Sequence, residues 1–332
     1  MTLSDVADAV NDFDAAALIE QQQPVLLRGL VRDWPLVRAG LAGADAAAAY
    51  LKRFYAGAPV VGYAGPPAIG GRFFYDDSLT AMNFTATRVK LDTWLDRLLS
   101  DTQGEAHYVG STDLDAYLPG LRAENDLPQS AFAGATPRAS IWIGNRTVAA
   151  THYDMSNNVA CCMAGRRRFT LFPPEQVENL YPGPLEPTPG GQAVSMVDPR
   201  APDLARYPRF AEAQRAAQVF DLEPGDVLVY PALWWHNVEA LSDFNILINY
   251  WWNEAPAFLD SPMNALLHGL LSLRDRSDSE KQAWRAMFNY YVFGPATHAG
   301  EHLPEPARGP LAPLDALAAR RLRAQLLQRL NR

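Results

Sequence analysis

The sequence is short of cysteine and of long apolar runs, and each shortage excludes a class of protein. Two cysteines occur in 332 residues. They are the neighbours Cys161 and Cys162, which in a strand point to opposite faces. A stabilising disulfide framework is therefore excluded, and a reducing compartment is expected. No uninterrupted apolar run approaches the ~18 residues that a membrane-spanning helix needs.

Net positive charge is also lacking. Lys and Arg number 29 against 37 Asp and Glu, a formal charge of −8. This balance favours solubility and argues against broad electrostatic binding to nucleic acid or to anionic membranes. The N-terminal run MTLSDVADAVNDFD carries acids where a signal peptide carries bases. We therefore expect a cytoplasmic protein that binds no membrane.

Proline and tryptophan, by contrast, are abundant, with 26 and 8 residues, and 48% of the chain is hydrophobic. The chain can thus bury a sizeable core as one large domain or two ordinary ones. Since proline interrupts helices and central strands, many short elements joined by turns are expected. This composition favours an all-β or α+β protein over a helical bundle.

The pattern along the chain predicts three parts. Residues 1–104 alternate helical and extended signals, and we expect an α/β segment that packs on the core. Residues 105–255 contain short strand-like runs separated by Gly or Pro, which is typical of a sandwich or barrel. Within them, 182–217 holds seven prolines and is expected to be a long loop. Residues 256–332 turn helical, and leucines on one side of Leu314–Leu330 could pack on the barrel or on a second copy of the chain.

Three residues form a candidate metal site. His152 and Asp154 stand at i and i+2, so in an extended segment they project from the same face. His236 follows a strand-like run and two tryptophans. Two histidines and one carboxylate are the facial triad of non-haem Fe(II) oxygenases. A His-X-Asp sequence is common, however, and a histidine after two tryptophans is more often packed in a core than bound to a metal. The evidence for a metal site therefore comes from the neighbouring motifs.

Those motifs occur in a specific order. They are His152-Tyr153-Asp154, Asn158, Ala164–Pro174 (AGRRRFTLFPP), Asn179–Pro182 (NLYP), Pro224–Leu228 (PGDVL), Trp234-Trp235-His236 and Asn249-Tyr250-Trp251. This series resembles the JmjC/cupin-like 2-oxoglutarate oxygenases, and among them the asparaginyl hydroxylases. The ordered match spans roughly 105–255, with weaker similarity at Pro24–Trp34.

The resemblance implies a mainly β protein with flanking helices, built on a double-stranded β-helix or jelly roll, with a C-terminal helical segment. It implies that His152, Asp154 and His236 bind Fe(II), with 2-oxoglutarate as cosubstrate and O2 as oxidant. The basic residue that pairs with the distal carboxylate of 2-oxoglutarate falls on Arg167, where the asparaginyl hydroxylases have lysine. Arg166 and Arg168 remain alternatives if the turn shifts the phase of the strand, although alternation points both the other way.

Other cosubstrate contacts are implied with less direct matches. Tyr108 matches a tyrosine at the same carboxylate, and Asn158 and Asn249 match amides near the iron. A threonine of the relatives is here Ala149, so its hydroxyl is missing or is supplied by Thr147 or Thr151. His107 is a further pocket candidate. Five tryptophans are expected to form barrel core and pocket wall: Trp142, Trp234, Trp235, Trp251 and Trp252.

The leading functional hypothesis is an oxygenase that hydroxylates a protein or peptide side chain and forms a homodimer through its C-terminal helices. A small-molecule or RNA-base hydroxylase is an alternative, although the negative charge makes nucleic acid less attractive. Demethylation of N-methyl-lysine is a third chemistry open to the family. A cupin-like binding protein without turnover is a fourth, which the intact triad and Arg167 disfavour.

Overall fold

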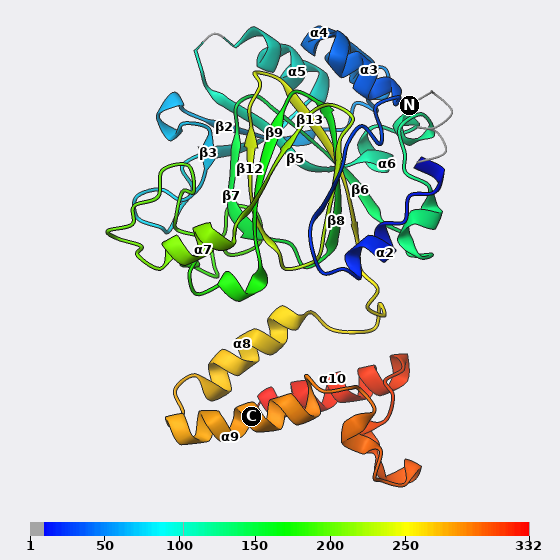
Figure 1. Cartoon of the computed structure of the whole chain (residues 1–332), viewed down its shortest axis with the longest axis vertical. Helices are drawn as coiled ribbons and strands as arrows, with labels where there is room; N and C mark the ends of the chain where they lie inside the picture. Colours follow the sequence, from blue (N-terminus) through cyan, green and yellow to red (C-terminus); the bar gives the residue numbers. More distant parts are fainter. Residues whose placement is uncertain (1–9, 102, 332) are drawn as a thin grey trace. The chain divides into compact units, whose positions relative to one another are not determined.

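The computed structural model describes residues 10–101 and 103–331, and it divides into two units, Met1–Asn253 and Glu254–Arg332. The first unit contains two β-sheets and several short helices, and the second contains helices (Figure 1). The expected mainly β jelly roll with C-terminal helices is confirmed. Among the described residues, no helix is long and apolar enough to cross a membrane.

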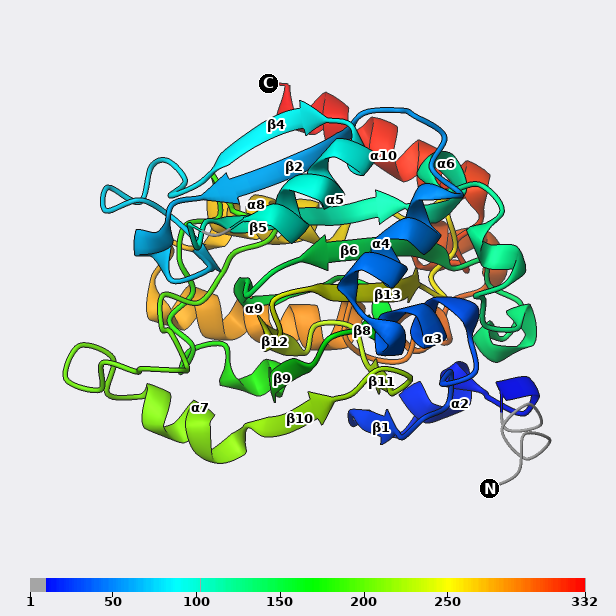
Figure 2. The same cartoon turned by 90° about the horizontal axis from the view of Figure 1, so that it is seen from above.

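The larger sheet has eight antiparallel strands. Figure 2 shows them side by side. In spatial order they are β1 (Val25–Leu27), β11 (Val227–Tyr230), β8 (Asn157–Ala164), β13 (Asn245–Trp252), β6 (Arg138–Gly144), β5 (Ala106–Asp113), β2 (Val60–Gly65) and β4 (Thr85–Val89). The central strands β8 and β13 are buried on both faces, which their near-continuous apolar sequences require.

The smaller sheet has five strands and carries most of the candidate ligands. Their order is β10 (Gln218–Leu222), β9 (Arg167–Phe172), β12 (Trp235–Ala240), β7 (Val148–Tyr153) and β3 (Arg72–Phe73). All its pairs are antiparallel except β3 with β7. The inner faces of the two sheets share one hydrophobic cluster, in which Cys162 and Leu228 of the larger sheet lie with Phe169 and Leu171 of the smaller one.

The outer face of the larger sheet is covered by helices. They include α2 (Ala15–Ile19), α3 (Pro35–Ala42), α4 (Ala44–Lys52), α5 (Leu91–Ser100) and α6 (Leu114–Tyr117), and Figure 2 shows α3, α4 and α5 in front of the strands. The apolar stripe of α5, with Trp94 and Leu95 buried, belongs to the main core. Gly40 lets α3 lie directly on β8, since a Cβ there would stand 2.4 Å from the carbonyl oxygen of Met163.

The N-terminal part, the proline-rich segment and the C-terminal unit differ in what they add to the fold. The N-terminal part supplies β1, β2, β3 and β4, so it extends both sheets as well as packing on them. The proline-rich segment 182–217 is mostly irregular and ends in α7 (Phe210–Ala216). The C-terminal unit holds α8 (Pro262–Leu273), α9 (Asp278–Tyr291) and α10 (Ala316–Leu330). Neither α8 nor α9 has a buried residue.

Candidate metal centre

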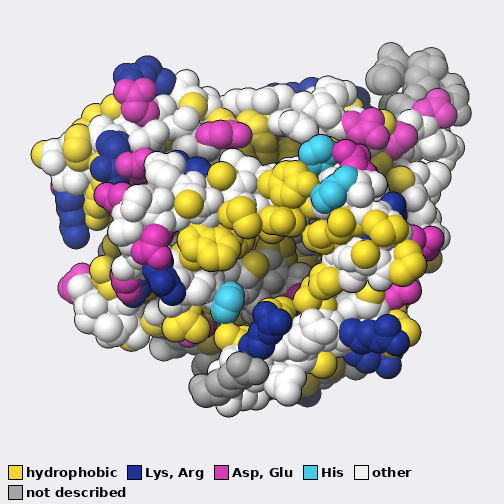
Figure 3. All heavy atoms as spheres, turned by 90° about the horizontal axis from the view of Figure 1, so that it is seen from below, with side chains coloured by type: hydrophobic (Ala, Val, Ile, Leu, Met, Phe, Trp, Pro, Cys, Tyr) yellow, Lys and Arg dark blue, Asp and Glu magenta, His cyan; other side chains and the backbone are white. Residues whose placement is uncertain are grey.

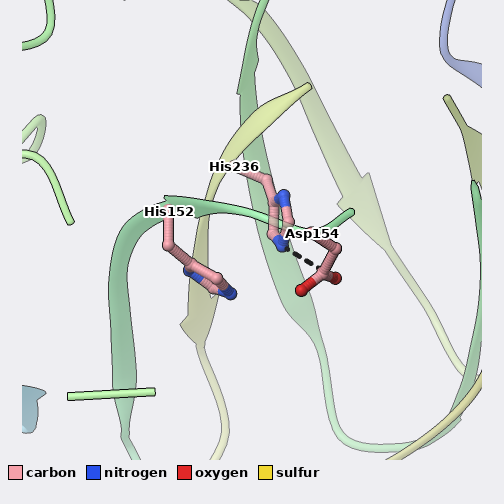
Figure 4. Close-up of side chains that lie close together, drawn as sticks. All are labelled: His152, Asp154 and His236. Atoms are coloured by element: carbon pink, nitrogen blue, oxygen red, sulfur yellow. Dashed lines mark ion pairs between the residues drawn. The ribbon is translucent and has the colours of Figure 1, made fainter. Parts of the chain in front are cut away.

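His152, Asp154 and His236 meet at one point of the smaller sheet. One ligand atom from each lies within 4.8 Å of the other two. Figure 4 shows the two imidazoles and the carboxylate gathered around a common space, although the chain separates His152 from His236 by several strands. The two histidines come together because β7 and β12 pair with His236 directly opposite His152. Their ring centroids are 4.3 Å apart.

Asp154 follows the last residue of β7, where the chain leaves the sheet. Its backbone carbonyl accepts a hydrogen bond from the Leu233 N–H at 2.8 Å. This bond ties the end of β7 to the turn that precedes β12, so the carboxylate is held on the same side as both imidazoles. The i and i+2 spacing of His152 and Asp154 thus has the effect expected from strand alternation.

Both histidines are oriented by backbone carbonyls. The Nδ1 of His152 lies 2.8 Å from the carbonyl oxygen of Ala150, and the Nδ1 of His236 lies 3.0 Å from that of Trp234. Because a carbonyl can only accept, each Nδ1 carries the proton, and the Nε2 lone pair is left for the common space. Burial, with the nearby His152 adding to it, lowers the pKa of His236 to about 4. The imidazole of His236 is therefore neutral at physiological pH, as a metal ligand must be.

One oxygen of the Asp154 carboxylate is held by two donors. Its Oδ2 accepts from Nδ2 of Asn158 at 2.8 Å and from Nε1 of Trp251 at 3.0 Å. The Nε2 of His236 lies 3.6 Å from the same oxygen. No described residue donates a hydrogen bond to Oδ1. The chemistry of the donor set, two Nε2 lone pairs and a carboxylate oxygen, fits a divalent transition metal.

The three side chains line a cavity of about 400 Å³ between the sheets. Aromatic rings form much of its wall: Tyr63, Phe73, Phe84, Tyr108, Trp142, Phe169, Tyr230 and Trp251. Residues 189–192 of the proline-rich segment also line it. The cavity is therefore apolar over most of its surface, with a few convergent polar groups, which is the usual make-up of a ligand site.

Arg167 places a cation inside this cavity. Its residue is 3% exposed, its Nε has no hydrogen-bond partner, and its Nη2 reaches only the carbonyl oxygen of Trp142 at 3.5 Å. Burial lowers the pKa of Arg167 and raises that of Tyr108, which lines the same cavity. A buried guanidinium without a carboxylate partner is costly, so this arrangement favours an anionic ligand.

The neighbours of Arg167 face outward, as alternation along β9 requires. Arg168 pairs with Asp221 through two hydrogen bonds of 2.7 and 2.8 Å, and Arg166 pairs with Glu223 at 2.8 Å. Both side chains are about half exposed. Of the three consecutive arginines, only Arg167 lines the cavity.

Of the other residues predicted at the site, some line the cavity and some do not. Asn249 lines the cavity, and Asn158 lies behind it against Asp154. Thr151 does not line the cavity: its hydroxyl is buried without a partner, whereas Thr147 and Ala149 are in the lining. Thr151 neighbours His152 on β7, so regular alternation turns its side chain away from the cavity that His152 faces.

One expectation about an individual side chain is wrong, and another is correct but incomplete. His107 is not a cavity residue, because it is buried beside Trp94 of α5 on the other face of the sheet. Trp142 and Trp251 do more than form a wall, since each donates an indole hydrogen bond within the site. Strand alternation from Asn249 to Trp251 is the sequence signal that could have identified Trp251.

Comparison with known proteins places these features in context. The family described as the cupin-like domain matches residues 10–258. Lysine-specific demethylase 8 of Xenopus tropicalis is 26% identical over 237 residues, which cover 70% of this chain and 48% of that protein. The tRNA wybutosine-synthesizing protein 5 of Danio rerio is 32% identical over 154 residues, covering 44% and 42%. The solved structure of E. coli ycfD aligns with a TM-score of 0.41 and 15% identity, covering 94% of this chain and 65% of that one. The chain spans about half the length of the curated relatives it matches.

Proposed function

The chain belongs to the cupin-like domain family, and from this premise we propose that it is an Fe(II)- and 2-oxoglutarate-dependent oxygenase. The observation that carries the proposal is the presence of two imidazoles whose Nδ1 atoms face backbone carbonyls, a carboxylate and an unpartnered buried guanidinium in one cavity. The first three suit a metal that keeps open coordination positions, and the fourth suits a dicarboxylate.

Different residues would bind the metal and the cosubstrate. His152, Asp154 and His236 would hold the metal, and Arg167 would pair with the distal carboxylate of 2-oxoglutarate, with Tyr108, Thr147 and Asn249 along the same wall. When bound, Fe(II) supplies the activation of O2 that converts 2-oxoglutarate to succinate and CO2 and oxidises a substrate C–H bond. The protein orients the cosubstrate, keeps the imidazole of His236 neutral and excludes water with its aromatic wall.

The charge of the cavity supports an uncharged substrate group. Among the described residues of the lining, Asp154 is the only carboxylate and Arg167 the only guanidinium, and no lysine is present. These two charges, with those of Fe(II) and the 2-oxoglutarate dianion, cancel. A phosphate or an ammonium entering the cavity would therefore find every opposite charge already paired, and burying it unpaired is expensive.

We therefore propose that the substrate is a neutral side chain of a protein or peptide, which becomes hydroxylated. A small neutral metabolite is the alternative that the same cavity supports. The relatives named as a lysine demethylase and as a tRNA-modifying protein keep demethylation and RNA modification as outcomes to test. The hypothesis of a cupin-like binding protein without turnover is disfavoured, because the candidate metal triad and Arg167 are all present in the cavity.

Succinate formation tests the proposal. Purified protein is incubated with Fe(II), ascorbate and 2-oxoglutarate, and succinate is measured with and without peptide, nucleoside and amino-acid pools. We expect succinate from the wild type and background levels from His152→Ala. His268→Ala is the control, since His268 lies on α8, outside the cavity. Equal succinate from His152→Ala, or none from the wild type under any condition, would overturn the proposal.

We also propose that a second copy of the chain covers the C-terminal helices. Hydrophobic side chains are widely exposed on the face displayed in Figure 3. Many of the exposed large ones belong to the C-terminal unit: Leu266, Leu267, Leu271, Trp284, Met287, Tyr290, Tyr291, Val292, Phe293, Leu314, Leu317, Leu326, Leu327 and Leu330. Exposure on this scale is typical of an interaction surface.

A further inference from the structure

The Asp154 carboxylate is restrained from one side only. Nδ2 of Asn158 and Nε1 of Trp251 both donate to Oδ2, at 2.8 and 3.0 Å, and no described residue donates to Oδ1. Two donors on one oxygen fix the rotation of the carboxylate about its Cβ–Cγ bond. They also occupy that oxygen, so Oδ1 is the atom left to bind a metal.

The side-chain amide of Asn158 is held in turn by Asn249, and that of Asn249 by Trp142. Nδ2 of Asn249 donates to Oδ1 of Asn158 at 3.1 Å, and Nε1 of Trp142 donates to Oδ1 of Asn249 at 2.7 Å. Because an indole can only donate, Trp142 determines which end of the Asn249 amide is the oxygen, and Asn249 then does the same for Asn158. The chain of donors therefore runs in one direction, from Trp142 to Asp154.

Trp251 reaches the same oxygen directly, without an intermediate. It stands two residues after Asn249 on β13, so both project from the face of the sheet that lines the cavity. Its ring meets that of Trp142 edge to face, with centroids 5.7 Å apart. Trp252 points the other way, packs on Phe132, and leaves its indole Nε1 without a partner. The two neighbouring tryptophans of β13 therefore differ. The indole N–H of Trp251 donates a hydrogen bond to Asp154, and the indole N–H of Trp252 donates none.

We propose that Trp251 is a positioning residue for the metal site. Its indole N–H, together with Asn158, holds Oδ2 so that Asp154 presents Oδ1 as a single ligand atom beside the two Nε2 atoms. This inference rests on the proposed metal-dependent function. Groups that orient metal ligands in this way usually change metal affinity by about 10- to 100-fold when they are removed.

The test uses Mn(II) and Co(II) with the full-length, metal-free protein. Trp251→Phe removes the N–H and keeps an aromatic ring, and Trp251→Tyr is a second variant of the same kind. Trp252→Phe is the matched control, because it removes an N–H that has no partner. The measurements are the Mn(II) Kd by calorimetry, the visible absorption spectrum of the Co(II) form, and the melting temperature of the metal-free protein.

We expect Kd to rise about 10- to 100-fold in Trp251→Phe, with an altered Co(II) spectrum and an unchanged melting temperature without metal. Trp252→Phe should keep the wild-type Kd and spectrum. An unchanged Kd and spectrum in both Trp251 variants would overturn the inference and leave the proposed function intact. A loss of affinity that accompanies a lower metal-free melting temperature would also overturn it, because Trp251 would then act through packing. Wild-type protein that binds no Mn(II) would instead contradict the proposed function.

Discussion

At the scale of single residues, Arg167 and Arg168 show how alternation assigns opposite roles to identical neighbours. Arg167 is buried in the cavity without an anionic partner, while Arg168 is half exposed and bidentate to Asp221. A surface pair of that kind contributes little to stability. The buried guanidinium has a cost that a bound carboxylate would offset, so the same residue type lies on the surface in one case and faces the cavity in the other.

Arg167→Met should weaken 2-oxoglutarate binding. Removing a charge-assisted pair of hydrogen bonds from a dry cavity costs about 3 kcal/mol, which is a factor of about 100 in Kd. Arg168→Met is the control and should leave Kd unchanged. Calorimetric titration of 2-oxoglutarate into the Mn(II)-loaded variants checks this. Equal weakening in the two variants would contradict the assignment.

Because the two buried cysteines have raised pKa values, we expect the free energy of unfolding to fall at alkaline pH. Burial raises the pKa of Cys162 from 9.0 to about 12, and it raises that of Cys161 as well. Between pH 9 and 12 the unfolded chain therefore loses thiol protons that the folded chain keeps, and the free energy of unfolding falls as the pH rises. Urea unfolding at pH 8 and pH 10 should show a steeper loss in the wild type than in a Cys161→Ala/Cys162→Ala variant. Parallel pH slopes would contradict buried, protonated thiols.

At the scale of elements, the turn between β8 and β9 sets the phase of Arg167. Gly165 has φ +69°, and a Cβ there would stand 2.4 Å from the carbonyl oxygen of Phe244. Such a backbone position accepts glycine and strains other residues. This turn therefore determines which of the three arginines faces the cavity.

Gly165→Ala should lower the free energy of unfolding by about 3 kcal/mol, because it adds both a left-handed strain and a clash with backbone. Gly190→Ala is the control: a Cβ there meets nothing within 4 Å, and the change should stay within about 0.5 kcal/mol. Urea denaturation of the two variants measures both values. A stable Gly165→Ala protein would mean that the turn tolerates a side chain.

Several elements could be predicted from sequence, because a simple periodicity governs them. Short strand-like runs within 105–255 predict β9, β11 and β13, and the apolar residues Leu91, Trp94, Leu95 and Leu98 have the spacing of one helical face, which predicts α5. The glycines and prolines of residues 60–83 predict hairpins or an ordered loop, but they do not predict that β2 pairs with β4 and β5. The place of β1 beside β11 likewise depends on the tertiary fold.

The site could be predicted where chemistry and strand alternation agree, and not where the role of a side chain depends on a contact between distant strands. His152 and Asp154 lie together as their i and i+2 spacing predicted, and His236 lies with them as the resemblance implied. Thr151 faces away from the cavity because it is the neighbour of His152 on β7, so alternation alone could have excluded it. Trp251 was expected only to form core or pocket wall, and its hydrogen bond to Asp154 was missed because that bond depends on two strands meeting.

At the scale of the whole molecule, the acidic chain surrounds a cavity whose only guanidinium among the described residues is Arg167. The net charge of −8 therefore describes the surface and says little about the ligand. A local cation in an apolar cavity is enough to select a small anion, since opposite charges attract more strongly where water is excluded.

The C-terminal unit predicts self-association. Light scattering at micromolar concentration should give twice the chain mass of 36.6 kDa. Leu271→Glu places a charge where a 78% exposed leucine is expected to meet the partner, and it should give the monomer mass. Leu41→Glu, at an exposed leucine of α3, should remain a dimer. A monomeric wild type would contradict the proposed homodimer.

The central claim is that 2-oxoglutarate binds beside a metal held by His152, Asp154 and His236. Calorimetric titration of 2-oxoglutarate into wild-type protein, with and without Mn(II) and under otherwise equal conditions, tests it most directly. We predict binding that requires Mn(II) and that is lost in His152→Ala. Equal affinity with and without Mn(II), or binding that survives His152→Ala, would contradict the account.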